Sequence, residues 1–327
     1  MEIQNETHSI TPKDRFVMSP QTNILNKKYT LVKEIGNGCY GNLYSSTHKK
    51  IQYAIKISRN TYDYIKAAKN EIELIKNMKH HNIIKLYDYF SHESYICIVM
   101  RIYKENLYQY QRHNYYINHV DTCSILIKIA TGLEYLKQNR IVHRDLKPEN
   151  IMVVEDKVID IIIIDFGLAT TCSKLKSEYY KRKYNVQSIW YRAPEIFFEI
   201  EYETEIDMWS LGCIAYELYW RRPLFRSKHK LDLFIRQNII LGAPPYSILK
   251  SIPRVHKYYD TIMNPTHIYD DDNCKCQIED GAFKSDHKNN TELLDFIFGC
   301  CEWDQHIRTT PTQAIKKLRH IRENPHS

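Results

Sequence analysis

The chain has 327 residues, of which 43% are hydrophobic, so it can bury a sizeable core either as one large domain or as two lobes. Lys and Arg number 46 against 39 Asp and Glu, which gives a net charge of +7. The positive residues do not gather into one long block, so we expect no nucleic-acid partner, while an anionic substrate stays open.

Nine cysteines are spread along the chain without a CxxC pair, and an odd number in a chain of this length favours reduced thiols over a disulfide framework. Cys274 and Cys276 lie close together, but a metal site needs more ligands nearby, so we interpret them as ordinary thiols. No apolar N-terminal signal segment is evident, and the apolar run Val158–Ile164 is too short to span a bilayer. We expect no membrane partner and a cytoplasmic or nuclear location.

Residues 1–28 are polar and lack sustained periodicity, so they are predicted to be a flexible leader, with order beginning at Tyr29. Alternating β-branched and aromatic residues predict three strands, at 29–35, 42–47 and 52–57. Apolar residues at three- and four-residue intervals then predict a helix at 62–78. Two more short strands are predicted at 84–90 and 95–102. Residues 29–102 are therefore expected to form a five-stranded antiparallel lobe with one main helix.

From Leu107 the pattern is mainly helical. Residues 121–138 carry one apolar stripe, and residues 207–219 are nearly all apolar, which indicates a deeply buried helix. Residues 103–322 are predicted to be a mostly helical lobe, with loops and short helices at 246–290 and a tail at 323–327. The expected fold class is α+β, with two lobes meeting at a cleft near residues 100–103.

The stretch IVHRDLKPENI at residues 141–151 places Asp145, Lys147 and Asn150 on one short loop after an apolar run. A base, a phosphate-neutralising cation and a metal ligand can all project from such a loop, so the spacing suits chemistry on a phosphate better than packing.

The segment GNGCYG at residues 36–41 lies between two predicted strands, where glycines let the backbone close over phosphates without Cβ clashes. Dinucleotide folds with this pattern continue into a helix, whereas here a strand follows. An ordinary glycine hairpin remains the alternative.

Lys56 lies near the end of the third predicted strand, where its ammonium can contact the α- and β-phosphates of a nucleotide. Lysine is usually a solvated surface residue, so this interpretation requires a partner. Glu71, on the predicted helix, can reach inward and pair with Lys56. Asp165 follows a buried-looking strand and precedes Phe166 and Gly167, a position suited to holding Mg²⁺.

With these parts in order, the sequence resembles the eukaryotic protein kinases. The motifs GNGCYGNL, YAIK, HRDLKPEN, DFG and APE occur in the order of that family, and the resemblance covers about residues 29 to 322. Asp207 resembles the helix Asp that braces the backbone of the HRD motif, and Arg308 resembles the partner of Glu195.

The resemblance implies ATP and Mg²⁺ as cofactors and proteins as substrates. It assigns catalytic roles to Asp145, Lys147, Lys56 and Glu71, with Asp145 accepting the substrate proton, and metal binding to Asn150 and Asp165. Leu43 and Ala54 are expected to sandwich the adenine, and Met100 to back its pocket. The nucleotide-binding residues that it implies are Ile35, Gly36, Asn37, Gly38, Cys39, Tyr40, Gly41, Leu43, Ala54, Lys56, Met100, Ile102, Asn150 and Asp165.

Lys147 and Ser188 match the pattern of Ser/Thr kinases, in which this serine bridges the catalytic Asp and Lys. WYRAPE at residues 190–195 resembles the CMGC group, whose arginine at this position, here Arg192, favours proline after the acceptor. LGAPP and EWDQHIRTTPTQAI look most like the dual-specificity tyrosine-regulated branch. The Arg of HRD and the GCYG loop resemble the corresponding residues of cyclin-dependent kinases. In those kinases the residue matching Tyr40 is an inhibitory phosphosite. We favour an aromatic flap over the nucleotide for Tyr40.

The activating acceptors of these relatives correspond to Lys183 and Asn185, and neither carries a hydroxyl group. Of the arginines that bind such a phosphate, Arg144 and Arg192 remain. We therefore hypothesise activity without phosphorylation in this segment, although Tyr184, one residue out of register, stays a candidate acceptor.

The sequence thus predicts a monomeric, proline-directed Ser/Thr protein kinase. One alternative is a pseudokinase that serves as a scaffold, which the retention of Lys56, Glu71, Asp145, Asn150 and Asp165 disfavours. Another is a cyclin-dependent kinase that needs a partner. The predicted helix reads IKAAKNE in place of PSTAIRE, so a cyclin-type activator is not expected.

Overall fold

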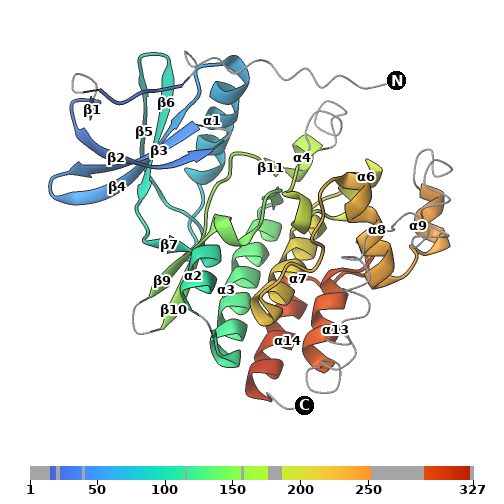
Figure 1. Cartoon of the computed structure of the whole chain (residues 1–327). Coiled ribbons are helices and arrows are strands. Elements are labelled where there is room, and N and C mark those ends of the chain that lie inside the picture. Colours follow the sequence, from blue (N-terminus) through green and yellow to red (C-terminus); the bar gives the residue numbers. More distant parts are fainter. Residues whose placement is uncertain are drawn as a thin grey trace. The chain divides into compact units, whose positions relative to one another are not determined.

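The computed structural model describes residues 15–19, 23–38, 41–114, 116–155, 158–175, 186–251 and 291–324. They fall into two compact units. The first, here called the sheet unit, extends to Tyr103 and includes residues 166–168, and the second, the helical unit, holds residues 104–165 and the chain from Ala169 onward. Figure 1 shows the strands and helices of each.

The sheet unit is built on an antiparallel sheet of six strands in the order β1-β2-β3-β4-β6-β5. The strands are β1 (Ile24–Leu25), β2 (Tyr29–Gly38), β3 (Gly41–His48), β4 (Ile51–Ser58), β5 (Leu86–His92) and β6 (Tyr95–Arg101). Helix α1 (Tyr62–Ile75) contacts β4, β5 and β6 and buries residues that recur at helical spacing, including Ala68, Ile72 and Ile75. The mixed α+β class predicted from the sequence is confirmed.

The sheet has one strand more than the five predicted, because β1 lies within the predicted leader. Leu25 is fully buried and Phe16 is 5% exposed, and both pack in an apolar cluster with Tyr29 and Tyr44. For residues 15–19 and 23–28 the expectation of a flexible leader was therefore wrong. The few apolar side chains among many polar ones are enough to hold the segment, because they cover apolar residues of the sheet.

The helical unit contains longer helices, several short helices and two small sheets. The longer helices are α2 (Leu107–His113), α3 (His119–Gln138), α7 (Glu205–Trp220), α8 (Lys230–Leu241), α13 (Thr291–Cys300) and α14 (Pro311–Glu323). The short helices are η2 (Pro148–Asn150), α4 (Cys172–Leu175), η3 (Ile189–Tyr191), α6 (Pro194–Phe198) and α9 (Tyr246–Ser251). The strands are β7 (Glu105–Asn106), β9 (Ile151–Glu155) and β10 (Ile159–Ile163) in one sheet, and β8 (Ile141–Val142) with β11 (Thr170–Thr171) in another.

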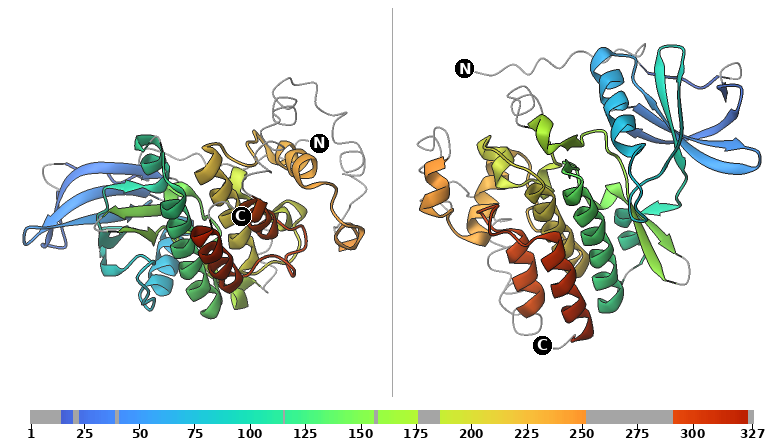
Figure 2. Two further views of the ribbon diagram at one scale, coloured as in Figure 1. Left: turned by 90° about the horizontal axis from the view of Figure 1, so that it is seen from below. Right: turned by 180° about the vertical axis from the view of Figure 1, so that it is seen from behind.

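Helix α7 is the central helix of this unit. Every residue from Ile206 to Leu218 is buried, as its nearly all-apolar sequence predicts. The helix packs against α3 and α13, while α14 lies along α3 (Figure 2). A Cβ atom at Gly212 would lie 2.8 Å from the Cβ of Cys300, so the absence of a side chain allows α7 and α13 to approach closely.

Most of the segment predicted as loops and short helices at 246–290, including Cys274 and Cys276, lies outside the described residues, as does the predicted tail after residue 324. Among the described helices, none combines the length and the apolar character needed to cross a membrane.

A buried acid joins α7 to η3. The hydroxyl of Tyr191 donates to Oε2 of Glu217 at 2.6 Å, and Glu217 is 7% exposed. Burial raises the pKa of the Glu217 carboxyl to about 7; the hydrogen bond from Tyr191 opposes the shift, and the charge of Glu149 adds to it.

We expect Glu217→Gln to change how stability depends on pH. Folding raises the pKa of Glu217, so the stability that this carboxyl contributes is fully present below its unfolded pKa and is lost as pH rises through the folded value. Relative to wild type, the variant should therefore gain up to about 3 kcal/mol in the free energy of unfolding between pH 4.5 and pH 8. Urea unfolding at a series of pH values measures this gain.

Glutamine can still accept the hydrogen bond from Tyr191, so packing is preserved in this variant. The matched control is Glu73→Gln, which removes an exposed carboxylate. A pH-independent difference between Glu217→Gln and wild type would show that Glu217 does not titrate in this range.

Candidate active site

Asp145 is the centre of a hydrogen-bond network in the helical unit, and it is 9% exposed. Its Oδ1 accepts from the Ser188 hydroxyl at 2.9 Å and from the Ser188 backbone N–H at 3.1 Å. Its Oδ2 accepts from Lys147 Nζ at 2.9 Å and from Asn150 Nδ2 at 3.1 Å. Lys147 Nζ also donates to Ser188 Oγ at 2.8 Å, so the predicted serine bridge between Asp145 and Lys147 is present.

Asp207 holds the backbone that carries this network. Its carboxylate accepts the backbone N–H of His143 at 2.7 Å and that of Arg144 at 3.0 Å, as predicted. Arg144 has a φ of 66°, a left-handed conformation that costs energy for a residue with a side chain, and the Asp207 bonds help to fix it. Burial raises the pKa of Asp207, while the nearby imidazole and these two N–H donors oppose the shift.

Asn150 and the segment before Asp165 lie together. The backbone N–H of Ile164 donates to the Asn150 carbonyl at 2.9 Å, and the imidazole of His143 bonds to the Ile164 carbonyl at 2.9 Å. The Asn150 amide nitrogen donates to the carbonyl and carboxylate of Asp145, so its side-chain oxygen can serve as an acceptor or ligand.

The donor set at Asn150 and Asp165 fits Mg²⁺. Carboxylate and amide oxygens are hard ligands, and Mg²⁺ is usually held by one or two carboxylates together with substrate phosphates. Among the described residues no cluster of three or more His, Cys, Asp or Glu could hold a metal. A site of two protein ligands that is completed by phosphate oxygens agrees with this ligand preference and needs no cluster of three such residues.

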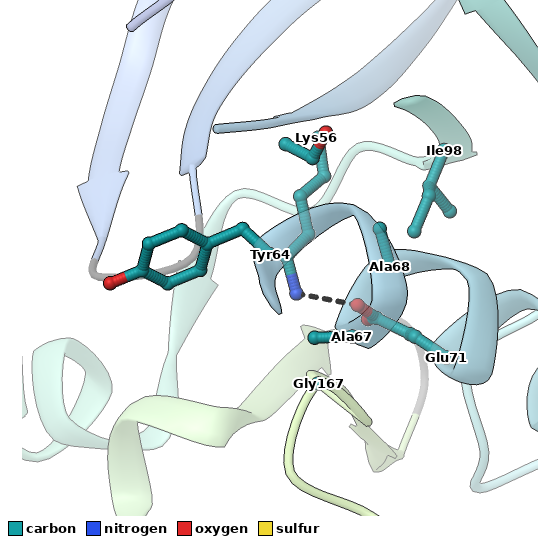
Figure 3. Close-up of a pocket in the computed structure, with 8 residues that line it drawn as sticks. Lys56, Tyr64, Ala67, Ala68, Glu71, Ile98 and Gly167 are labelled. Atoms are coloured by element: carbon teal, nitrogen blue, oxygen red, sulfur yellow. Dashed lines mark hydrogen bonds and ion pairs between the residues drawn. The ribbon is translucent and has the colours of Figure 1, made fainter. Parts of the chain in front are cut away.

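Lys56 and Glu71 form the predicted ion pair of the sheet unit. Lys56 Nζ lies 2.8 Å from Glu71 Oε2, and the side chains are 16% and 3% exposed (Figure 3). The pair lines a small pocket between β4 and α1, together with Ser58, Tyr64, Ala67, Ala68, Ile98 and Gly167. Because Glu71 projects from the buried face of α1, the pair ties this helix to the sheet and fixes the ammonium.

The remaining nucleotide candidates of the sheet unit lie on β2, β3 and β4 and around the end of β6. Leu43 pairs in register with Lys56, and Ala54 pairs with Met100. Ile35, Gly36, Asn37 and Gly38 are on β2, Gly41 opens β3, and Ile102 follows β6, while Cys39 and Tyr40 lie outside the described residues. Gly41 has a φ of 153°, and a Cβ there would lie 2.0 Å from the Ile57 carbonyl oxygen, so only glycine fits.

Gln187 and Arg192 shape the segment before α6. Gln187 has a φ of 63°, and its carbonyl accepts from Arg192 Nη2 at 2.7 Å and from Arg192 Nε at 3.2 Å. Its side-chain amide donates to the Ile206 carbonyl and to Ser210 Oγ, each at 2.9 Å, which ties the segment to α7. Lys183, Tyr184 and Asn185 lie outside the described residues.

Sequence reasoning missed two of these features. It singled out Arg192 but not its partner Gln187, whose left-handed backbone has no signal in the sequence. It also passed over Glu217, although an acidic residue in the nearly all-apolar run at residues 207–219 was a signal that could have been used.

The protein kinase domain family matches residues 29–318 of the chain. The chain is 29% identical to human dual specificity tyrosine-phosphorylation-regulated kinase 4 over 302 residues, covering 88% of the chain and 56% of that protein. It is 31% identical over 304 residues to the Drosophila melanogaster dual specificity tyrosine-phosphorylation-regulated kinase 2, covering 88% of the chain and 40% of that protein.

A third relative is the probable dual specificity protein kinase YAK1 homolog of Encephalitozoon cuniculi, 33% identical over 232 residues, covering 69% of the chain and 56% of that protein. The chain spans about half the length of these curated relatives. They agree with the predicted resemblance to the dual-specificity tyrosine-regulated branch of the CMGC group. Since the family match extends over residues 29–318, nearly the whole chain, the chain belongs to the protein kinase domain family.

Proposed function

We propose that this chain is an ATP-dependent protein kinase that transfers the γ-phosphoryl group to Ser or Thr of protein substrates. The observation that carries the proposal is the Asp145 carboxylate held between Lys147, Ser188 and Asn150. A carboxylate in hydrogen-bond contact with a hydroxyl and an ammonium has the groups that phosphoryl transfer to an alcohol needs.

The Ser188 hydroxyl donates to Asp145 Oδ1, which supports a role for this carboxylate as an acceptor of hydroxyl protons. In the proposed reaction a substrate hydroxyl donates to Asp145, and its oxygen attacks the γ-phosphorus. The bond from phosphorus to the β,γ-bridging oxygen breaks, the hydroxyl proton passes to Asp145, and the products are a phosphorylated side chain and ADP. Lys147 neutralises negative charge on the transferring group.

The sheet unit is proposed to bind the nucleotide. The ion pair with Glu71 directs the Lys56 ammonium to the α- and β-phosphates, and Leu43, Ala54, Met100 and Ile102 contact the adenine. Asn150 and Asp165 would hold Mg²⁺, which neutralises charge on the phosphate oxygens when it is bound.

A preference for proline after the acceptor is also part of the proposal, and the contacts of the Gln187 carbonyl support it. Both contacts from Arg192 occupy this oxygen, so it is not available to accept the backbone N–H of a substrate residue. A residue with an N–H leaves that donor unsatisfied on binding, which costs about 1–3 kcal/mol, whereas proline has no N–H to lose.

Activity without phosphorylation of the activation segment is also part of the proposal. The resemblance to protein kinases implies that arginines bind an activating phosphate, but here Arg192 donates to the Gln187 carbonyl, and the matching acceptor positions hold Lys183 and Asn185. The active conformation is instead proposed to be held by the bonds from Asp207 and Gln187 described above.

The first test is phosphoryl transfer by the purified chain with Mg²⁺, γ-labelled ATP and peptide libraries containing Ser-Pro and Thr-Pro. Asp145→Asn and Asp165→Asn should each lower the rate at least about 100-fold. Asp295→Asn, which changes an exposed residue of α13, should leave the rate unchanged. Equal signals from wild type and Asp165→Asn would instead favour the scaffold interpretation.

The second test compares peptides that differ only after the acceptor, with Pro, Ala or N-methylalanine at that position. N-methylalanine also lacks the N–H, so it should match proline, and the alanine peptide should show a kcat/KM lower by about 5- to 100-fold. If alanine and N-methylalanine are equally poor, the preference comes from the ring of proline and not from the missing N–H.

The third test concerns Tyr184. Tyr184→Phe and phosphatase-treated wild type should both keep their activity within about twofold, because the proposed active conformation needs no phosphate there. Mass spectrometry of the treated protein verifies that no phosphate remains. Loss of activity in both samples, restored by phosphorylation of wild type alone, would refute the proposal.

A further inference from the structure

In the described part of the N-terminal segment, Arg15 contacts both strands that flank the glycine-rich loop, residues 36–41. Arg15 Nη2 lies 2.7 Å from Glu34 Oε1 on β2, and Nε donates to Asn42 Oδ1 on β3 at 3.1 Å. In the amide orientation that satisfies both atoms of the Asn37 side chain, its oxygen accepts from Arg15 Nη2 at 2.8 Å and from Nη1 at 3.3 Å. One guanidinium therefore bonds to both strands that carry the loop.

The neighbouring residue anchors this contact. Phe16 is 5% exposed, and its ring packs edge-on against Tyr44 and Tyr95, with centroid distances of 5.7 Å and 5.5 Å. The carbonyl of Phe16 also accepts the Tyr44 hydroxyl at 3.2 Å. Because the backbone at Phe16 is fixed, the neighbouring Arg15 loses less conformational entropy when its side chain bonds to the strands of the loop.

The acceptors are also bonded to one another. Asn42 is 2% exposed, and its amide nitrogen donates to Glu34 Oε1 at 3.2 Å, so Glu34 receives one bond from Arg15 and one from β3. A planar guanidinium with donors in a fixed fork suits such a set of oxygens, whereas lysine offers a single ammonium on a flexible chain.

We propose that Arg15 is a positioning residue that holds the glycine-rich loop in the conformation that binds the nucleotide phosphates. This inference rests on the proposed function for its nucleotide, but it concerns a segment outside the kinase motifs. Glycine allows many backbone conformations, and bridging β2 to β3 beside Gly36, Gly38 and Gly41 reduces their number. Arg15 acts through the loop and contacts no substrate atom.

The test measures the dissociation constant of MgATP by calorimetry and the KM values for ATP and peptide. Arg15→Ala should weaken MgATP binding and raise the KM for ATP about 3- to 10-fold, with the KM for peptide unchanged. Arg15→Lys, which keeps the charge and loses the fork, should recover only part of the affinity.

The matched control is Lys28→Ala. Lys28 lies in the same N-terminal segment and forms an ion pair of 2.8 Å with Asp88, and its side chain is 39% exposed against 37% for Arg15. Since this pair lies away from the loop, its loss should leave the affinity for MgATP unchanged. Equal losses in Arg15→Ala and Lys28→Ala would mean that the segment acts through general stability, which overturns the proposal.

A measurement without nucleotide separates this inference from the proposed function. Hydrogen exchange of the free protein should accelerate in peptides covering residues 35–43 for Arg15→Ala, and not for Lys28→Ala. Unchanged exchange in these peptides overturns the proposal for Arg15 whether or not the chain transfers phosphate. If exchange is faster in Arg15→Ala than in wild type, but the wild type transfers no phosphate, the effect of Arg15 on the loop stands and the proposed function is removed.

Discussion

The helical unit depends on the carboxylate of Asp207. A buried charge is costly unless its lone pairs are used, and Asp207 uses them on the backbone N–H groups of His143 and Arg144. These bonds hold Arg144 at a φ of 66°, and Asp145 follows directly. The position of the candidate catalytic carboxylate is thus set by the first turn of a helix that begins some sixty residues later in the chain.

The same end of α7 also fixes the segment proposed to contact the residue after the acceptor. Gln187 donates to the Ile206 carbonyl and to Ser210, and its backbone N–H donates to the Arg144 carbonyl at 2.8 Å. The catalytic loop and this segment are therefore bonded to each other as well as to the helix. A buried helix makes a suitable platform, because its packing leaves little room for the bonded groups to shift.

The sheet unit achieves its order differently. Its ion pair between Lys56 and Glu71 joins a strand to α1, and its N-terminal segment covers aromatic residues of the sheet. The β2 side of its glycine-rich hairpin is exposed at Asn37 and Gly38, while Gly41 and Asn42 on the β3 side are buried. Contacts from outside the hairpin, such as those of Arg15, therefore have more influence on its conformation than they would on a buried strand.

Local sequence was enough to predict the strands β2 to β6, the helices α1, α3 and α7, and the candidate residues. Periodicity depends on neighbours in the chain, so α1, α3 and α7 were predicted within a few residues of their bounds, and the spacing in HRDLKPEN placed Asp145, Lys147 and Asn150 on one loop. The resemblance to protein kinases added the bonds from Asp207 and the ion pair of Arg308 with Glu195, at 2.7 Å.

Other features were decided only by the tertiary structure. The packing of Phe16, the extra strand β1, the contacts of Arg15, the bond between Tyr191 and Glu217 and the occupied carbonyl of Gln187 each join residues whose identities do not indicate their partners. A short apolar or charged stretch can be exposed to solvent or packed against another segment. Which of the two occurs depends on which segments the folded chain brings next to it. The sequence by itself therefore determined which chemical groups this protein carries on its candidate catalytic loop, and the folded chain determined which groups hold them in place.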